Sequence, residues 1–305
     1  EEDWIETSDT DKSMQNYVEW VLHLCKTENV DIFFVKKNAM YIMHEADKFK
    51  QLGVTLISDD YDTLRKIENK SCVYDILADD KYVKSFIPEY HVFKNSQGAI
   101  AYIEKHRMFD DICLKFNKDE GGTSFRAIKD RTLQLGDLYH YDLNTVTSDE
   151  AIHLVSNADS DTSKLLFMEM LDSPEISIDC YNSCNGFIAL ARMKVAGRKQ
   201  KLFYNSELSD ICMAIGNRLG LKFPYNVQFR VTRNGNVENI NDLRLLEVNP
   251  RMSGGLYYEV ECGKNIAVVC LLDMCGYVNA YDINEFINFD NVYLSHIEKA
   301  IIIGP

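Results

Sequence analysis

Short apolar runs alternate with helical patterns in the first part of the chain. The runs DIFFV (31–35) and VTLIS (54–58) have the length of buried strands, and a helical stretch over residues 39–52 lies between them. Gly53 follows that stretch as a helix C-cap residue. This strand–helix–strand order predicts a parallel sheet. An amphipathic helix over 14–27 precedes it, and because no strand precedes that helix, the first strand of the domain is expected to be missing.

From about residue 110 the pattern becomes that of an antiparallel sheet. Strand-length apolar runs occupy 111–116, 164–171, 175–181 and 186–195. In NVQFRV (226–231) apolar and polar residues alternate, as on a half-buried strand. The Asn-Gly pair that follows is a hairpin signal. These changes of pattern predict an α/β (α+β) protein in which Pro88 opens a new section.

The run LLEVNPRMSGG (245–255) places three polar residues at alternate positions. In a strand Glu247, Asn249 and Arg251 would share one face, and the hairpin would lay Gln228 of the neighbouring strand beside them. Oxygen donors in one plane suit Mg²⁺. A guanidinium beside them would neutralise charge on a transferring phosphoryl group. For an isolated E-x-N-x-R pattern, however, a solvated sheet face is the better explanation.

Two further clusters are weaker taken singly. Lys115 lies in a strand-like run, and the glycine turn at 121–124 offers backbone N–H groups and two hydroxyls to anionic oxygens. It is neither a Walker A loop nor a G-x-G-x-x-G motif. The segment 169–171 ends another strand before a proline-containing connection, and its backbone edge could read the N1 and N6 atoms of a purine. A glycine hairpin and a plain hydrophobic strand explain each cluster alone.

Taken in order, these motifs resemble the ATP-grasp superfamily, nearest to its carbamoyl-phosphate-synthetase-type branch, which is carboxylate-amine ligase-like. The resemblance covers about residues 65–275, and EVNPRMSGG together with the upstream NVQF is its strongest part. It implies the ATP-grasp fold: a partial Rossmann-like domain (1–90) followed by two α+β subdomains that sandwich ATP. Residues 91–172 would form the lid, and 173–305 the C-terminal subdomain with the metal site.

The resemblance also implies site residues. Those expected to contact the nucleotide are Lys70, Lys115, Gly121, Gly122, Thr123, Ser124, Glu169, Met170, Leu171 and Glu175. Gln228, Glu247 and Asn249 would hold Mg²⁺, with Mn²⁺ as the alternative ion. Arg251 would stabilise an acyl phosphate.

Two further expectations concern Arg192 and the segment between Gly235 and Glu247. Arg192 would reach phosphate or the acid substrate, although a solvated strand face explains Arg192 and its neighbour Lys194 equally well. Between Gly235 and Glu247 stands NVENINDLRLL, where the family has a short return, so an insertion or bulge is expected near 238–242. This leaves the register of Gln228 against Glu247 open.

The function implied is that of an ATP-dependent ligase. It would activate a carboxylate as an acyl phosphate for attack by an amine or similar nucleophile, so its partners would be small-molecule carboxylate and amine substrates. One alternative is an ATP-grasp enzyme with another phosphoryl acceptor, through carboxyphosphate or a kinase-like reaction. Another is a non-catalytic nucleotide-binding module.

Composition excludes several other classes. The net charge of −14 argues against non-specific binding of nucleic acid or anionic membranes. No apolar run of membrane-spanning length and no signal-peptide pattern occurs. Nine scattered cysteines, an odd number without metal-site spacing, indicate free thiols in the cytoplasm. Ser177 and Ser253 have no visible triad partners, and a homodimer is the expected assembly.

Overall fold

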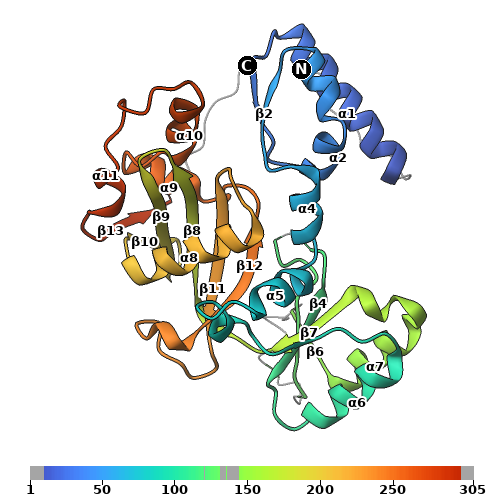
Figure 1. The fold of residues 1–305 in the computed structure, drawn as a ribbon. Helices are drawn as coiled ribbons and strands as arrows, with labels where there is room; N and C mark the ends of the chain where they lie inside the picture. The colour runs from blue at the N-terminus through green and yellow to red at the C-terminus, as the bar shows by residue number, and fades with distance from the viewer. Residues whose placement is uncertain (1–9, 120, 131–134, 136–143, 297–305) are drawn as a thin grey trace, which may run out of the picture. The chain divides into compact units, whose positions relative to one another are not determined.

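The computed structural model describes residues 10–119, 121–130, 135 and 144–296, which group into two compact units (Figure 1). Unit 1 comprises residues 1–67, 177–227 and 248–305, and unit 2 comprises 68–176 and 228–247. Three strands have residues in both units, namely β8 (Asp172–Ser183), β11 (Tyr225–Val231) and β12 (Leu243–Asn249).

The N-terminal part of unit 1 contains the predicted strand–helix–strand arrangement. Its elements are α1 (Thr10–Thr27), β1 (Ile32–Phe34), α2 (Ala39–His44), α3 (Ala46–Gln51), β2 (Thr55–Ile57) and α4 (Tyr61–Ile67). β1 and β2 pair in parallel with Ile32 opposite Thr55, which confirms the predicted parallel pairing. The helix expected over 39–52 is broken at Glu45, whose φ of −106° and ψ of 21° are not helical. Gly53 follows with a φ of +80°, as a C-cap glycine does.

A six-stranded sheet occupies the rest of unit 1 and extends through β8, β11 and β12. Its order is β12-β11-β8-β9-β10-β13, with β9 (Gly186–Ala196), β10 (Lys199–Phe203) and β13 (Val292–Ser295). The helices of this part are α8 (Ser206–Leu219), α9 (Leu256–Glu261), α10 (Ile266–Met274) and α11 (Asn284–Ile287). α8 begins after Asn205, whose side chain accepts the N–H of Leu208, and ends before Gly220.

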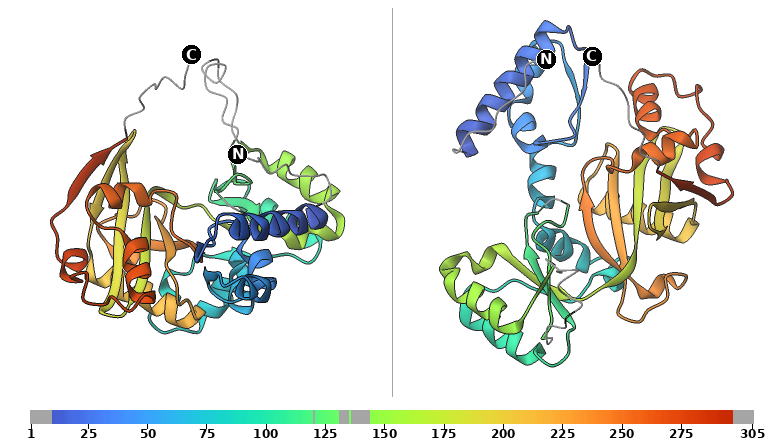
Figure 2. Two further views of the ribbon diagram at one scale, coloured as in Figure 1. Left: turned by 90° about the horizontal axis from the view of Figure 1, so that it is seen from above. Right: turned by 180° about the vertical axis from the view of Figure 1, so that it is seen from behind.

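Unit 2 is built on a five-stranded sheet. The order is β3-β7-β4-β5-β6, with β3 (Tyr90–His91), β4 (Ile112–Phe116), β5 (Arg126–Ile128), β6 (Thr145–Val146) and β7 (Leu165–Glu169). α6 (Ser96–His106) and α7 (Ser148–Asn157) lie side by side against it (Figures 1 and 2). A capping box of Thr147 and Glu150 begins α7. The unit also contains α5 (Lys70–Ala78) and the 3₁₀ turns η1 (Lys84–Phe86) and η3 (Asp159–Lys164).

The two faces of this sheet differ in chemistry because side chains alternate along a strand. On β4, Ile112 and Leu114 pack into the core under α6 and α7. Cys113 belongs to a separate apolar cluster with Met168 of β7, which lies opposite it in the register. Lys115, two residues after Cys113, therefore shares the face turned away from the helices.

The return between β11 and β12 is the segment for which an insertion or bulge was predicted. The chain turns at Asn234, with a φ of +60°, and then forms a 3₁₀ turn, η4 (Ile240–Asp242). The backbone N–H of Thr232 donates to the Asp242 carbonyl (2.7 Å), which closes the return at its base. The residues of the return thus form a short closed turn between the two strands. Among the described residues, none of the helices is long and apolar enough to span a bilayer.

Candidate functional site

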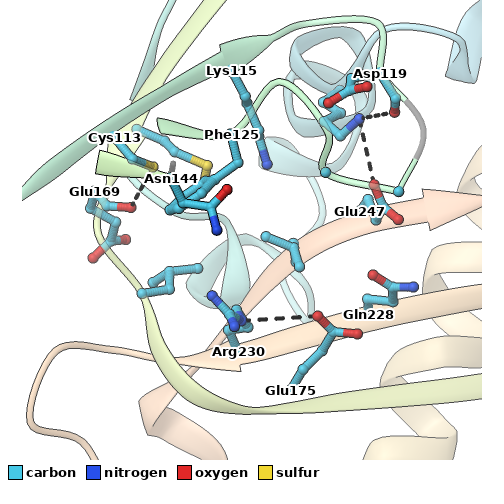
Figure 3. A pocket seen from close by; sticks show the side chains of 16 residues that line it. Cys113, Lys115, Asp119, Phe125, Asn144, Glu169, Glu175, Gln228, Arg230 and Glu247 are labelled. Atoms are coloured by element: carbon cyan, nitrogen blue, oxygen red, sulfur yellow. Dashed lines mark hydrogen bonds and ion pairs between the residues drawn. The ribbon is translucent and has the colours of Figure 1, made fainter. Parts of the chain in front are cut away.

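A pocket of about 410 Å³ opens on the face of the unit 2 sheet that is turned away from α6 and α7, and we call it the unit 2 pocket (Figure 3). Sixteen residues line it, all of them from unit 2: Lys70, Cys113, Lys115, Asp119, Gly121, Gly122, Phe125, Asn144, Met168, Glu169, Leu171, Glu175, Gln228, Arg230, Leu246 and Glu247. Most of the predicted nucleotide-contacting residues, and two of the three predicted metal ligands, are among them.

Two lysines enter this pocket from different elements. Lys70 is the first residue of α5, and its Nζ donates to the Asp119 carbonyl (2.6 Å) and lies 3.5 Å from a Glu247 carboxylate oxygen. Lys115 extends from β4 and is only 4% exposed. Burial, with a further effect of the Lys70 charge, lowers the pKa of Lys115 to about 8. A buried ammonium of this kind is stabilised when an anion enters the site.

The glycine turn after β4 is organised by one carboxylate. Asp119 accepts the hydroxyl of Thr123 (3.0 Å) and both the N–H (3.0 Å) and the hydroxyl (2.5 Å) of Ser124. Burial acts to raise the pKa of Asp119, but these hydrogen bonds outweigh it and lower the pKa. Gly121 and Gly122 line the pocket with φ of +68° and +66°, a conformation that favours glycine. The two hydroxyls predicted to meet anionic oxygens are engaged with Asp119 and do not line the pocket.

The wall opposite the turn is mostly apolar, with Cys113, Met168 and Leu171 in one cluster. Glu169 lines it too, but its carboxylate accepts the N–H of Glu89 (3.0 Å) and lies 3.9 Å from Arg244. The role predicted for Met170 finds less support, because its N–H donates to the Asp111 carbonyl (2.7 Å) and its side chain is not part of the lining. A flat apolar ring would fit against this wall.

The predicted metal ligands fall on two adjacent strands. Gln228 of β11 and Glu247 of β12 both line the pocket, and Asn249 occupies the alternate position after Glu247 on the same strand. Within the described part of the chain, no three His, Cys, Asp or Glu side chains gather as a metal site would require. One carboxylate with amide oxygens instead fits Mg²⁺, which keeps its waters and shares phosphate oxygens.

Arg192 belongs to a second cluster, in unit 1. Its Nη2 donates to the hydroxyls of Ser253 (3.0 Å) and Ser177 (3.4 Å). Ser253 in turn donates its N–H (2.6 Å) and hydroxyl (2.5 Å) to the two oxygens of Asp179, which is fully buried. The guanidinium passes so close to Gly255 that a Cβ there would lie 2.3 Å from its Cζ. The turn after the EVNPR motif is therefore held by two contacts, one with Arg192 and one with Asp179.

Glu259 of α9 is, like Asp179, a fully buried acid of the unit 1 cluster. Its side chain is 0% exposed, and its carboxylate lies 4.0 Å from Arg192 Nε. Burial first, and then the charge of Asp179, raise the pKa of Glu259 strongly. Arg251 lies in the same unit, and its Nη1 donates to the Met252 carbonyl (3.3 Å).

Comparison with known proteins shows what this chain is similar to. Residues 161–295 match the model of a family described as ATP-grasp in the biosynthetic pathway with Ter operon. No curated protein matches the chain. Solved structures do match it over most of its length.

Three of these structures illustrate the match. The biotin carboxylase domain of Hydrogenobacter thermophilus 2-oxoglutarate carboxylase, in complex with MgADP, ADP and bicarbonate, is 13% identical, with a TM-score of 0.63 over 91% of this chain and 60% of that one. Biotin carboxylase from Campylobacter jejuni, in complex with beta-gamma-ATP, is 12% identical, with a TM-score of 0.63 over 94% and 63%. Carboxyaminoimidazole ribonucleotide synthase from Aspergillus clavatus, in complex with ATP, is 13% identical, with a TM-score of 0.57 over 88% and 65%.

The chain has the ATP-grasp fold. This confirms the fold class and the resemblance stated from the motifs. The chain spans about three fifths of the length of the biotin carboxylases that it matches. The division of the ATP-grasp chain into 1–90, a lid over 91–172 and a C-terminal part over 173–305 stays a prediction, as do the individual site residues.

Several residues of the candidate site were not found from the sequence. Arg230 follows Gln228 at the alternate position of β11, so the same strand pattern would have placed it in the pocket. Asp119 stands just before the glycine turn, where acidic residues are common, and nothing marked it as the turn's anchor. The bond from Ser253 to Asp179 joins positions 74 residues apart, and no local pattern announces it. Glu259 reads as an ordinary helix residue.

Proposed function

We propose that the unit 2 pocket binds Mg-ATP and that the chain is an ATP-dependent ligase that activates a carboxylate. The observation that carries this proposal is the division of the pocket's lining. One end holds Lys70, Lys115 and two glycines with positive φ, and the facing wall is apolar. Cations and backbone N–H groups suit the triphosphate, and the apolar wall suits the base.

Lys115 gives the strongest support for a bound polyanion. Its ammonium is buried, and the nearest carboxylates of the pocket do not prevent its pKa from falling to about 8. Keeping a charged group in such a place costs free energy unless a ligand compensates it. A phosphate oxygen beside Lys115 and Lys70 would supply that compensation.

Gln228, Glu247 and Asn249 would hold the metal ion. Mg²⁺ held there would neutralise charge that develops during phosphoryl transfer. The side-chain oxygens of Gln228, Glu247 and Asn249 form a donor set that fits a hard cation. Mn²⁺, which prefers similar ligands, would serve in its place.

The unit 1 cluster would bind the acid substrate. In the proposed reaction a carboxylate oxygen attacks the γ-phosphorus, and the bond from that phosphorus to the ADP oxygen breaks. Arg251 and Arg192 would stabilise the resulting acyl phosphate. An amine then attacks the acyl carbon, loses a proton, and releases inorganic phosphate. No side-chain nucleophile is needed, and positioning with charge neutralisation provides the catalysis.

The substrates and setting complete the proposal. We propose small-molecule carboxylate and amine substrates and a homodimeric assembly. The nine cysteines are all free, which supports the proposed cytoplasmic location because that compartment keeps thiols reduced. Carboxyphosphate formation is the second candidate reaction, since bicarbonate accompanies MgADP in the matched 2-oxoglutarate carboxylase domain.

Hydroxylamine as a surrogate amine tests the reaction. The chain is incubated with Mg-ATP, hydroxylamine and pools of carboxylic acids, and hydroxamate and ADP are measured together. We expect one pool to give both products in equal amounts, and none with the Glu247→Ala variant. ADP without hydroxamate in a bicarbonate-containing pool would favour carboxyphosphate. ATP binding without ADP formation in any pool would contradict the ligase proposal and favour a binding module.

A further inference from the structure

Arg230 is a third cation of the unit 2 pocket, and the proposed reaction gives it no task. It stands on β11 two residues after Gln228, so the two side chains share a face of the strand. Both line the pocket, while Phe229 between them is fully buried against Phe86 on the other side. The alternation along β11 therefore orients the Arg230 side chain into the unit 2 pocket.

The surroundings of Arg230 do not account for its presence. Its Nε is buried and has no hydrogen-bond partner among the residues that the structure describes. The nearest carboxylate, that of Glu175, lies 4.0 Å from Nε, beyond hydrogen-bond distance, and the two side chains are 28% and 40% exposed. An ion pair between partly exposed groups contributes little to stability. Burying the N–H without a partner costs more than such a pair returns.

Arg230 also lies away from the phosphate end of the pocket. Figure 3 shows Arg230 and Glu175 together on the side opposite Lys115 and Asp119. Burial raises the pKa of the Cys113 thiol on the apolar wall to about 11, and the charge of Lys115 and then that of Arg230 oppose this effect. The guanidinium is thus a cation set across from the apolar wall, where a nucleobase would lie.

We propose that Arg230 recognises the nucleobase: its guanidinium plane stacks on one face of the base, while the apolar wall with Met168 covers the other. This inference rests on the proposed binding of Mg-ATP. A planar, weakly hydrated guanidinium stacks on aromatic faces, whereas a lysine ammonium in its place would keep the charge but lose the plane.

The Arg230→Lys variant separates stacking from charge. Dissociation constants for Mg-ATP and for Mg-tripolyphosphate, which has no base, are measured for the wild-type chain and the variant. We expect Mg-ATP to bind about tenfold more weakly to Arg230→Lys, because the stacking contribution is lost. Tripolyphosphate should bind both proteins equally. Arg233→Lys is the matched control, since Arg233 stands on the same hairpin, donates to the Phe109 carbonyl and is not part of the lining.

Three results would overturn the inference. If Arg230→Lys binds Mg-ATP as tightly as the wild type does, the plane of the guanidinium plays no part. If tripolyphosphate weakens in parallel with Mg-ATP, Arg230 is a phosphate ligand. If the wild-type chain binds neither ligand, the proposed nucleotide function itself fails, and this inference fails with it. The first two results leave the proposed function standing.

Discussion

Replacing Lys115 by methionine should stabilise the ligand-free protein and weaken its binding of ATP. Lys115 is 4% exposed, and its pKa falls from 10.5 to about 8, first because of burial and then because of Lys70. A lowered lysine pKa means that folding penalises the protonated form. The penalty is complete below pH 8 and fades as the pH rises from 8 toward 10.5. At pH 7 it amounts to about 3 kcal/mol.

Urea unfolding of the wild type and Lys115→Met measures this penalty. Methionine fills a similar volume without charge, so at pH 7 the variant should unfold with a free energy higher by about 1 to 3 kcal/mol. At pH 9.5 the remaining penalty is only about 1.4 kcal/mol, so the difference between the two proteins should shrink by about 2 kcal/mol. Lys118→Met, at a side chain that is 60% exposed, should change stability little at either pH.

The same variant connects stability to function. Mg-ATP should raise the unfolding free energy of the wild type much more than that of Lys115→Met, because the nucleotide relieves the buried charge only where the charge exists. A variant that is less stable than the wild type at pH 7, or a difference that does not change with pH, would refute the buried-charge argument. Unchanged affinity for ATP would refute the assignment of Lys115 to the phosphates.

Three further predictions concern single residues. Glu247→Ala should abolish Mg-dependent turnover while circular dichroism stays unchanged, and a fully active variant would contradict the metal assignment. Gly255→Ala places a Cβ 2.3 Å from the Arg192 guanidinium, so the substitution should displace that side chain. We expect a lower kcat for the acid substrate and an unaltered affinity for Mg-ATP. An equal loss of ATP affinity would contradict the proposed role of Arg192 in acid binding. Gly216→Ala places a Cβ 2.2 Å from the hydroxyl of buried Tyr225 and should lower the unfolding free energy by about 1 to 3 kcal/mol in urea titrations. An unchanged unfolding free energy would contradict this prediction.

Strand alternation was the most informative signal in the sequence. In NVQFRV it placed Val227, Phe229 and Val231 in the core, where all three are at most 1% exposed, and it left Gln228 for the pocket. Alternation depends only on the pleat of the backbone, so it survives without knowledge of the rest of the fold. The parallel β1–β2 pair was predictable from the strand–helix–strand order, because parallel strands need a crossover connection such as a helix.

Alternation failed where tertiary contacts take over. On β12 it predicts that Leu246 points into the core, yet Leu246 lines the pocket and Leu245 is fully buried. Asn226 was expected on the polar face of β11, but it is fully buried and donates to Ser177 (3.0 Å). Both departures involve partners far away in the sequence, which no local pattern reports.

Apart from Asn249, a proposed metal ligand that belongs to unit 1, the groups proposed for nucleotide binding belong to unit 2 and those proposed for acid binding belong to unit 1, and this makes their roles separable. Lys115, Arg230 and Glu247 are residues of unit 2, whereas Arg192 and Arg251 are residues of unit 1. Changes at Lys115 and Arg230 should therefore appear in the affinity for Mg-ATP measured without any acid. Changes at Arg192 and Arg251 should appear only when an acid is supplied, as a lower kcat or a higher KM. If Arg192→Leu weakened ATP binding in the absence of acid as strongly as Lys115→Met does, this division of labour between the units would be wrong.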